Sequence, residues 1–120
     1  MRKKLTELLL KRSGVSVGMP SIDEDVDSIL HRGRSSDVSF IEFMKGQPSQ
    51  CHENVSLLWN ASRDVYTIVT GYALLGGAWC QHSWCERGGV VIETTTERDA
   101  YFGFELTPEE SDIFYFNNAW

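Results

Sequence analysis

The sequence predicts an α+β protein in which N-terminal helices pack on an antiparallel sheet of about four strands. Residues 2–12 place their leucines on one helical face. Between residues 65 and 106, four stretches rich in β-branched and aromatic residues are separated by short, Gly-rich connections, as in hairpins. A chain of 120 residues can bury its own core as a single domain, 1–120. We divide it into a helical N-terminal part (1–47), a Cys-bearing helix plus sheet (48–106) and a C-terminal helix and tail (107–120).

Charge and cysteine content narrow the function classes. The net charge of −6 and the pI of about 4.9 give no overall field that attracts nucleic acid or an anionic membrane, so neither is expected as a partner. The N-terminal apolar run is interrupted by Glu7 and lacks a cleavage site, which argues against a signal peptide. Three cysteines, an odd number, then indicate free thiols and a reducing, cytoplasmic location. No cofactor is expected.

The first half of the chain contains three further expected elements. A short helix is expected around residues 23–31, within an otherwise irregular stretch. Residues 39–48 form a short amphipathic element that Gly46 and Pro48 interrupt. Ser49 stands where a helix N-cap would stand, so Cys51 falls in the first turn of the next helix. Helical spacing puts Cys51 on the apolar face with Val55, which directs the sulfur inward and His52 elsewhere.

The expected strands are 65–74, 78–85, 90–95 and 100–106. A two-residue turn at Gly76 and Gly77 pairs Gly71 with His82 and also Val69 with Trp84.

The next connection allows two registers. A four-residue loop at 86–89 places His82 directly opposite Glu93, whereas a two-residue turn at Gly88 and Gly89 makes the two residues diagonal neighbours. In both registers His82 and Glu93 share one face of the sheet, because side chains alternate with period two. The chain then closes with a helix that starts at a capping box formed by Thr107 and Glu110.

These placements suggest thiol chemistry. A helix N-terminus and a nearby imidazole lower the pKa of a thiol and make it nucleophilic. Cys51 lies at an expected helix N-terminus, and His82 supplies the nearby imidazole if the helix covers the face of the sheet that carries His82. Glu93, one strand away, is suited to fixing the tautomer of the imidazole. The expected site is therefore a Cys51–His82–Glu93 triad.

A Cys at a helix start, a His in "QHSW" of the following hairpin and an acid in "VVIETT" on the next strand resemble the chain order of the papain-like cysteine superfamily, in its transglutaminase-like and NlpC-like forms. The resemblance covers about residues 47–106 and implies a helix packed on an antiparallel sheet. It implies hydrolysis, deamidation or acyl transfer on a protein or small amide or acyl substrate. Transglutaminase-like proteins usually have Asp where this chain has Glu93, and "SQCHENV" is not the papain motif.

Further residues are candidates for substrate contacts. The backbone N–H of Cys51 is one candidate donor to an oxyanion, and the side chain of Gln47 or Gln50 is another. Trp84, on the face of His82, either shields the imidazole, forms a pocket wall or fills the core.

Two other readings stay open. Cys80, His82 and Cys85, completed by Cys51 or His52, form a candidate zinc set, although Cys80 and Cys85 face opposite sides of a strand. The second is a non-catalytic interaction module, and the aromatic segment "FYFNNAW" at the C-terminus then suggests a homodimer contact.

Overall fold

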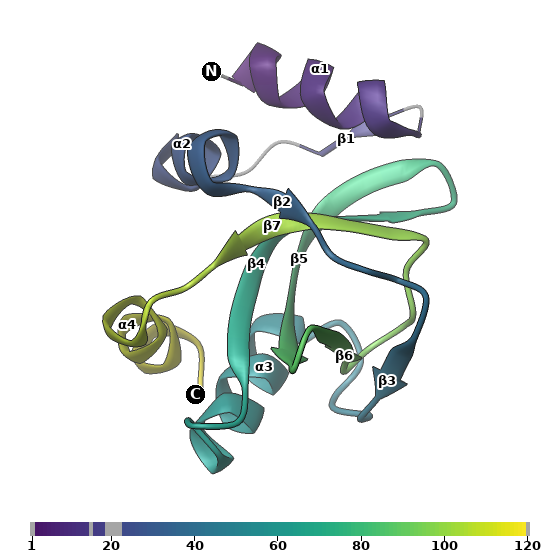
Figure 1. Ribbon diagram of the computed structural model, residues 1–120. Helices are drawn as coiled ribbons and strands as arrows, with labels where there is room; N and C mark the ends of the chain where they lie inside the picture. Colours follow the sequence, from purple (N-terminus) through teal and green to yellow (C-terminus); the bar gives the residue numbers. More distant parts are fainter. Residues whose placement is uncertain (1, 15, 19–22, 120) are drawn as a thin grey trace.

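The computed structural model describes residues 2–14, 16–18 and 23–119, and the predicted α+β class is confirmed (Figure 1). Within these ranges the chain forms four helices and one sheet of seven strands, so the expected four strands were too few. No helix there is both long and apolar enough to cross a membrane. The helices are α1 (Arg2–Arg12), α2 (Asp23–Arg32), α3 (Cys51–Ala61) and α4 (Pro108–Asn118). The strands are β1 (Ser16–Val17), β2 (Arg34–Ser35), β3 (Ile41–Phe43), β4 (Thr67–Leu75), β5 (Ala78–Arg87), β6 (Val90–Glu93) and β7 (Ala100–Glu105).

The three additional strands come from the part of the chain expected to be helical. The strand order is β2-β7-β4-β5-β6-β3, with β1 beside β5. The pairs β1·β5 and β3·β6 are parallel, and the others are antiparallel. Strands of two or three residues are too short to show an alternating pattern, and they form because a longer neighbour offers its edge.

The central hairpin has the predicted register. Gly76 and Gly77 have φ values of 59° and 81°, as a primed two-residue turn requires, and Gly71 lies opposite His82.

The following hairpin takes the two-residue alternative. Gly88 and Gly89 also have positive φ, and Arg87 pairs with Val90. The alternative prediction of a four-residue loop at 86–89 is therefore wrong. Continued along the strands, the observed register makes His82 and Glu93 diagonal neighbours.

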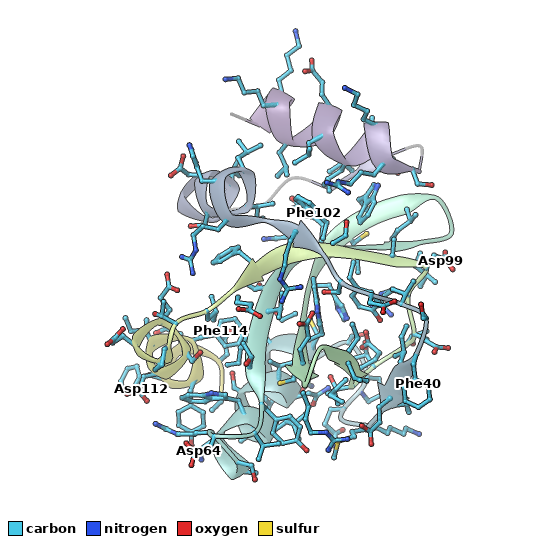
Figure 2. All side chains as sticks on the ribbon, viewed as in Figure 1. Phe40, Asp64, Asp99, Phe102, Asp112 and Phe114 are labelled. Atoms are coloured by element: carbon cyan, nitrogen blue, oxygen red, sulfur yellow. The ribbon has the colours of Figure 1, made fainter. Side chains whose placement is uncertain are left out.

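All four helices cover one face of the long strands, which we call the outer face. In Figure 1, α1 and α2 lie over one end of β4 and β5, and α3 and α4 lie at the other. Phe102, labelled in Figure 2, projects from β7 between the sheet and the N-terminal helices and belongs to their core cluster. The capping box of α4 is confirmed, with Thr107 accepting from the backbone N–H of Glu110.

The other face, which we call the inner face, lies inside a curled sheet. Residues 36–40 alone connect β2 and β3, the two outermost strands of the path, and so draw the two ends of the sheet together (Figure 1). Trp84 and Tyr101 fill the interior with ring centroids 4.8 Å apart. Gly103 leaves the room for this, because a Cβ there would lie 2.9 Å from the Trp84 ring. The inner face also holds two buried carboxylates, Glu86 and Glu93.

Arg34 ties the first strand of the path to the middle of the sheet. Its guanidinium crosses the inner face and binds the Glu86 carboxylate at 2.8 and 3.2 Å. Ser36 and the Trp84 indole also donate to Glu86. Burial alone would raise the pKa of Glu86, but these hydrogen bonds hold it below its ordinary value. The Arg34–Glu86 ion pair therefore links β2 to β5 across the inner face of the curled sheet.

Arg34→Met is expected to lower the free energy of unfolding by about 2 kcal/mol at neutral pH, because it leaves the buried Glu86 carboxylate without its cation. The depressed pKa means that this stabilisation is present above about pH 4.5 and is lost on acidification, so the variant should lose less stability than the parent below that pH. Urea titrations at several pH values measure both effects. Asp112→Asn, at an exposed ion pair with Arg63, is the control and should change stability by under about 1 kcal/mol.

Candidate active site

Helix α3 presents Cys51 in its first turn with an open N-terminus. The cap residue is Gln50, and its side chain makes no capping hydrogen bond. The prediction that Ser49 is the N-cap is wrong. Ser49 lies one residue before the cap position, with a φ of 60°. Among the described residues no side chain accepts from the first N–H groups of the helix, which point toward the N-terminal end where Cys51 stands.

Asn54 fixes the loop in front of Cys51. Its side-chain amide accepts from the backbone N–H of Gln47 at 2.9 Å and donates to the Gln47 carbonyl at 2.8 Å. Gly46 permits this close packing, since a Cβ there would lie 2.3 Å from the Asn54 side chain. Sequence reasoning missed Asn54. The available signal was a polar residue one helical turn after Cys51 in a helix with an apolar face.

Helix α3 does not cover the face that carries His82, contrary to the expectation. Val55 and Trp59 pack on the outer face, against a cluster containing Ile68, Cys85 and Ile92. His82 belongs to the inner face, because it alternates with Cys85 and Ser83 along β5.

Cys51 nevertheless reaches His82 at an open stretch of the sheet edge. Strand β6 pairs with β5 only from Cys85 to Arg87, and β1 pairs only at Ala78 and Trp79. The central residues of β5 therefore have no neighbouring strand on that side within the described ranges. The Cys51 thiol and the His82 imidazole interact there, because the imidazole lowers the pKa of the thiol and the thiol raises that of the imidazole.

Glu93 anchors the other side of the His82 ring. The Nε2 of His82 lies 2.8 Å from Glu93 Oε1, and the phenol of Tyr101 donates to the same oxygen at 2.8 Å. Thr95 donates its backbone N–H and its hydroxyl to Oε2, both at 2.9 Å. Burial alone would raise the pKa of Glu93, but these four hydrogen bonds keep it below its ordinary value. The carboxylate is thus a fixed anion that holds Nε2–H and leaves Nδ1 for the thiol.

The electrostatics favour an ionised thiol. Burial would raise the pKa of Cys51, but hydrogen bonds from His52 and His82 outweigh it and lower the pKa to about 5. Burial would likewise lower the pKa of His82, yet its contacts with Cys51 and Glu93 raise it above its ordinary value. Because the pKa of the thiol, about 5, falls below the raised pKa of the imidazole, the pair exists as thiolate and imidazolium at pH values between the two.

His52 is a second imidazole at the thiol, and the expectation that it points elsewhere is wrong. Its Nδ1 lies 3.9 Å from Cys51 Sγ and 2.7 Å from the hydroxyl of Ser83. Ser83 in turn lies 2.8 Å from the hydroxyl of Thr70, and Phe114 of α4 meets the His52 ring edge-on at 5.6 Å. This chain of contacts holds the ring from the outer face while His82 approaches from the inner face.

The remaining candidate residues lie in different surroundings. Gln47 and Gln50 are exposed beside the helix start, and no hydrogen bond from either side-chain amide occurs among the described residues. Trp84 has no exposed surface, so it is not a pocket wall. The planes of the Trp84 and His82 rings differ by 22°, so the two rings are stacked. Trp84 and Tyr101, which contact each other, pack against the imidazole on the core side.

The structure does not assemble the candidate zinc set. Cys80 is exposed, whereas Cys85 is buried on the outer face, where burial raises its pKa to about 12. Within the described ranges no three His, Cys, Asp or Glu side chains group closely enough to hold a metal ion. His82 instead makes its contacts with Cys51 and Glu93.

Comparisons with protein-family models, with curated proteins and with solved structures give no match for this chain. The case for a function therefore rests on the geometry of the site.

Proposed function

We propose that the protein is a cysteine-dependent acyl hydrolase, deamidase or acyltransferase that acts on an amide or thioester. One observation carries this proposal: His82, whose Nε2 is held at 2.8 Å by the buried Glu93 carboxylate, acts together with His52 to lower the pKa of the Cys51 thiol to about 5. A side-chain cluster of this kind supplies a nucleophile, a proton carrier and an orienting anion.

The first half of the proposed reaction forms a thioester. The thiolate of Cys51 attacks the carbonyl carbon, and the carbonyl electrons move to oxygen. The N–H groups at the start of α3 stabilise that oxyanion, because no capping side chain takes them, and the exposed amide of Gln47 or Gln50 is a candidate further donor. When the tetrahedral intermediate collapses, His82 Nδ1–H protonates the leaving amine or thiol.

The second half regenerates the thiol. Neutral His82 takes a proton from water or from an acceptor amine, which attacks the thioester carbonyl. Cys51 leaves as a thiolate, and the imidazolium is restored beside Glu93. Water as the acceptor gives hydrolysis or deamidation, and an amine gives acyl transfer.

The chain order supports the same proposal. Cys51 lies in the first turn of a helix, His82 on a later antiparallel strand and Glu93 on the next strand, a chain order that resembles the papain-like superfamily. The exposed Phe40 and Phe43 around the edge strand β3 favour the interaction module as the second candidate, and Figure 2 shows Phe40 at the rim of the molecule.

p-Nitrophenyl acetate tests the nucleophile directly. We expect a burst of about one p-nitrophenol per chain, because acylation outpaces deacylation, together with one acetyl group on the peptide that contains Cys51. Cys51→Ala should abolish the burst, and Cys80→Ala, which removes an exposed thiol, should leave it intact. Absence of a Cys51-dependent burst, with slow labelling of all three thiols, would contradict the enzyme and favour the interaction module.

Iodoacetamide tests the ionisation of the same thiol. The labelling rate of Cys51 should rise with a midpoint near pH 5. At about pH 6 the rate should exceed that of free N-acetylcysteine by about tenfold, since the roughly 300-fold larger thiolate fraction is partly offset by the lower nucleophilicity of a weakly basic thiolate. Mass spectrometry of the cysteine peptides gives the rates. A midpoint near that of free cysteine would contradict the proposed ion pair.

A further inference from the structure

Among the described residues, two hydrogen-bonded ties join the first turn of α3 to the rest of the molecule. One is His52, whose Nδ1 lies 2.7 Å from the hydroxyl of Ser83 on β5. The other is Asn54, whose side-chain amide accepts from the backbone N–H of Gln47 at 2.9 Å and donates to its carbonyl at 2.8 Å. At about 100° per residue, His52 lies about 100° to one side of Cys51 and Asn54 about 60° to the other. The two ties therefore flank the nucleophile.

The loop that Asn54 clamps is also bonded to the end of β6. Met44 donates its backbone N–H to the Glu93 carbonyl at 2.9 Å, and Gly46 donates to the Thr94 carbonyl at 2.8 Å. Asn54 therefore joins the start of α3 to the strand that carries the orienting carboxylate. The first tie joins the same turn to β5, the strand that carries the catalytic imidazole.

The packing of α3 does not by itself bring the thiol to the imidazole. Val55 and Trp59 fix the body of the helix on the outer face of the sheet, whereas His82 belongs to the inner face. Cys51 reaches His82 only past the open edge of β5, so its position depends on what holds the first turn. A displacement of about 1 Å at such a contact can cost about 10²-fold in rate.

The clamp between Asn54 and Gln47 is built for one arrangement. Asn54 is 8% exposed, and a Cβ at Gly46 would lie 2.3 Å from its side chain, so the loop and the amide fit closely. Gln47 itself is exposed, so water can replace the hydrogen bonds that its backbone loses when Asn54 is truncated. Truncation should therefore loosen the first turn of α3 without unfolding the chain.

We propose that Asn54 is a positioning residue for the nucleophile: it holds the first turn of α3 so that the Cys51 thiol stays against His82. The inference rests on the proposed function, because it concerns the same thiol. Asn54 acts through the helix and through the backbone of Gln47, and the chemistry stays with the thiol and the imidazole.

Asn54→Ala removes both hydrogen bonds of the clamp. We expect the midpoint for iodoacetamide labelling of Cys51 to rise by at least about one pH unit from about pH 5. The reason is that the low pKa of the thiol depends on contacts with His52 and His82, the titratable groups that interact with it among the described residues. The burst rate with p-nitrophenyl acetate should fall by about 10²-fold at neutral pH. A urea titration checks that the variant is folded.

Asn60→Ala is the matched control on the same helix. Asn60 lies in the last turn of α3, where its amide donates to the Tyr115 hydroxyl and accepts from Arg63. The substitution removes the same side-chain atoms far from the first turn. It should leave the labelling midpoint and the burst rate unchanged.

Gly46→Ala reaches the same contact from the side of the loop. Its Cβ would collide with the Asn54 amide, so we expect the changes seen with Asn54→Ala although the Asn54 side chain is intact. The double variant should be no worse than Asn54→Ala alone, because Asn54→Ala removes the atoms with which the Cβ collides. Additive losses would mean that the two residues act separately, and they would overturn the clamp as the cause.

The outcomes separate this inference from the proposed function. A folded Asn54→Ala variant with the labelling midpoint and burst rate of the parent overturns the positioning role alone. A loss of stability without a change of midpoint shows that the clamp serves the fold only, and it also overturns the positioning role. If the parent protein gives no Cys51-dependent burst, the proposed function itself fails.

Discussion

His82→Ala is expected to slow the burst with p-nitrophenyl acetate by about 10²–10⁴-fold at neutral pH. The variant loses the proton carrier and also one of the two imidazoles that lower the pKa of Cys51, so the midpoint for iodoacetamide labelling should move upward from about pH 5. Stopped-flow burst rates and the labelling profile measure the two effects. His82 is 2% exposed, so a urea titration must show that the variant is folded, and His82→Gln, which keeps more of the volume, serves as a second variant.

His52→Asn is the matched comparison, because it alters the other imidazole at the same sulfur. It should also raise the labelling midpoint, since His52 is the larger of the two hydrogen-bond contributions to the low pKa of Cys51. The burst rate should nevertheless fall by only about tenfold or less, because His82 and Glu93 still carry the proton. If His52→Asn abolishes the burst while His82→Ala retains it, the roles assigned to the two histidines are exchanged.

The sequence predicted the register between β4 and β5 because that register is a local property. Two-residue Gly turns and the alternation of side chains place His82 opposite Gly71 and on the same face as Glu93. These constraints act between neighbours in the chain, and tertiary packing does not change them. The choice between the two registers for the second hairpin was not local, since both loop lengths suit the residues 86–89.

Long-range contacts could not be predicted in this way. The parity of β5 shows that His82 and Ser83 face opposite sides, but not which side a helix covers. The structure places α3 on the Ser83 side and lets Cys51 reach His82 past the open edge of β5. The salt bridge between Arg34 and Glu86, 52 residues apart, depends on the same curling of the sheet.

Two features of the site were missed for a related reason. His52 was assigned by helical angle to a side away from the sulfur, but its ring lies against Ser83 of β5, and this long-range contact brings Nδ1 to 3.9 Å from Cys51 Sγ. Tyr101 belongs to a strand whose pairing with β4 brings it over Glu93, and no motif near Tyr101 indicates that contact.

Glu93→Gln is expected to lower kcat/KM with a p-nitrophenyl ester by about 10²–10⁴-fold, because an amide can present its NH₂ to Nε2 and select the wrong tautomer of His82. The raised pKa of His82 depends in part on the Glu93 charge, so it should fall in the variant. The window in which thiolate and imidazolium coexist begins near pH 5, where Cys51 ionises, and ends where His82 loses its proton. The alkaline limb of the pH–rate profile should therefore move to lower pH.

The pH dependence of stability tests the same carboxylate without any substrate. The lowered pKa of Glu93 gives stabilisation that is present above about pH 4.5 and is lost on acidification, whereas the raised pKa of His82 gives stabilisation that is complete below about pH 6.5 and is lost as the pH rises further. Glu93→Gln should flatten both changes in urea titrations. Tyr101→Phe removes one donor to Oε1 and keeps the charge, so it should retain the pH dependence and lose at most about tenfold in kcat/KM. Equal rate losses in the two variants would show that packing around the ring, and not the carboxylate charge, orients His82.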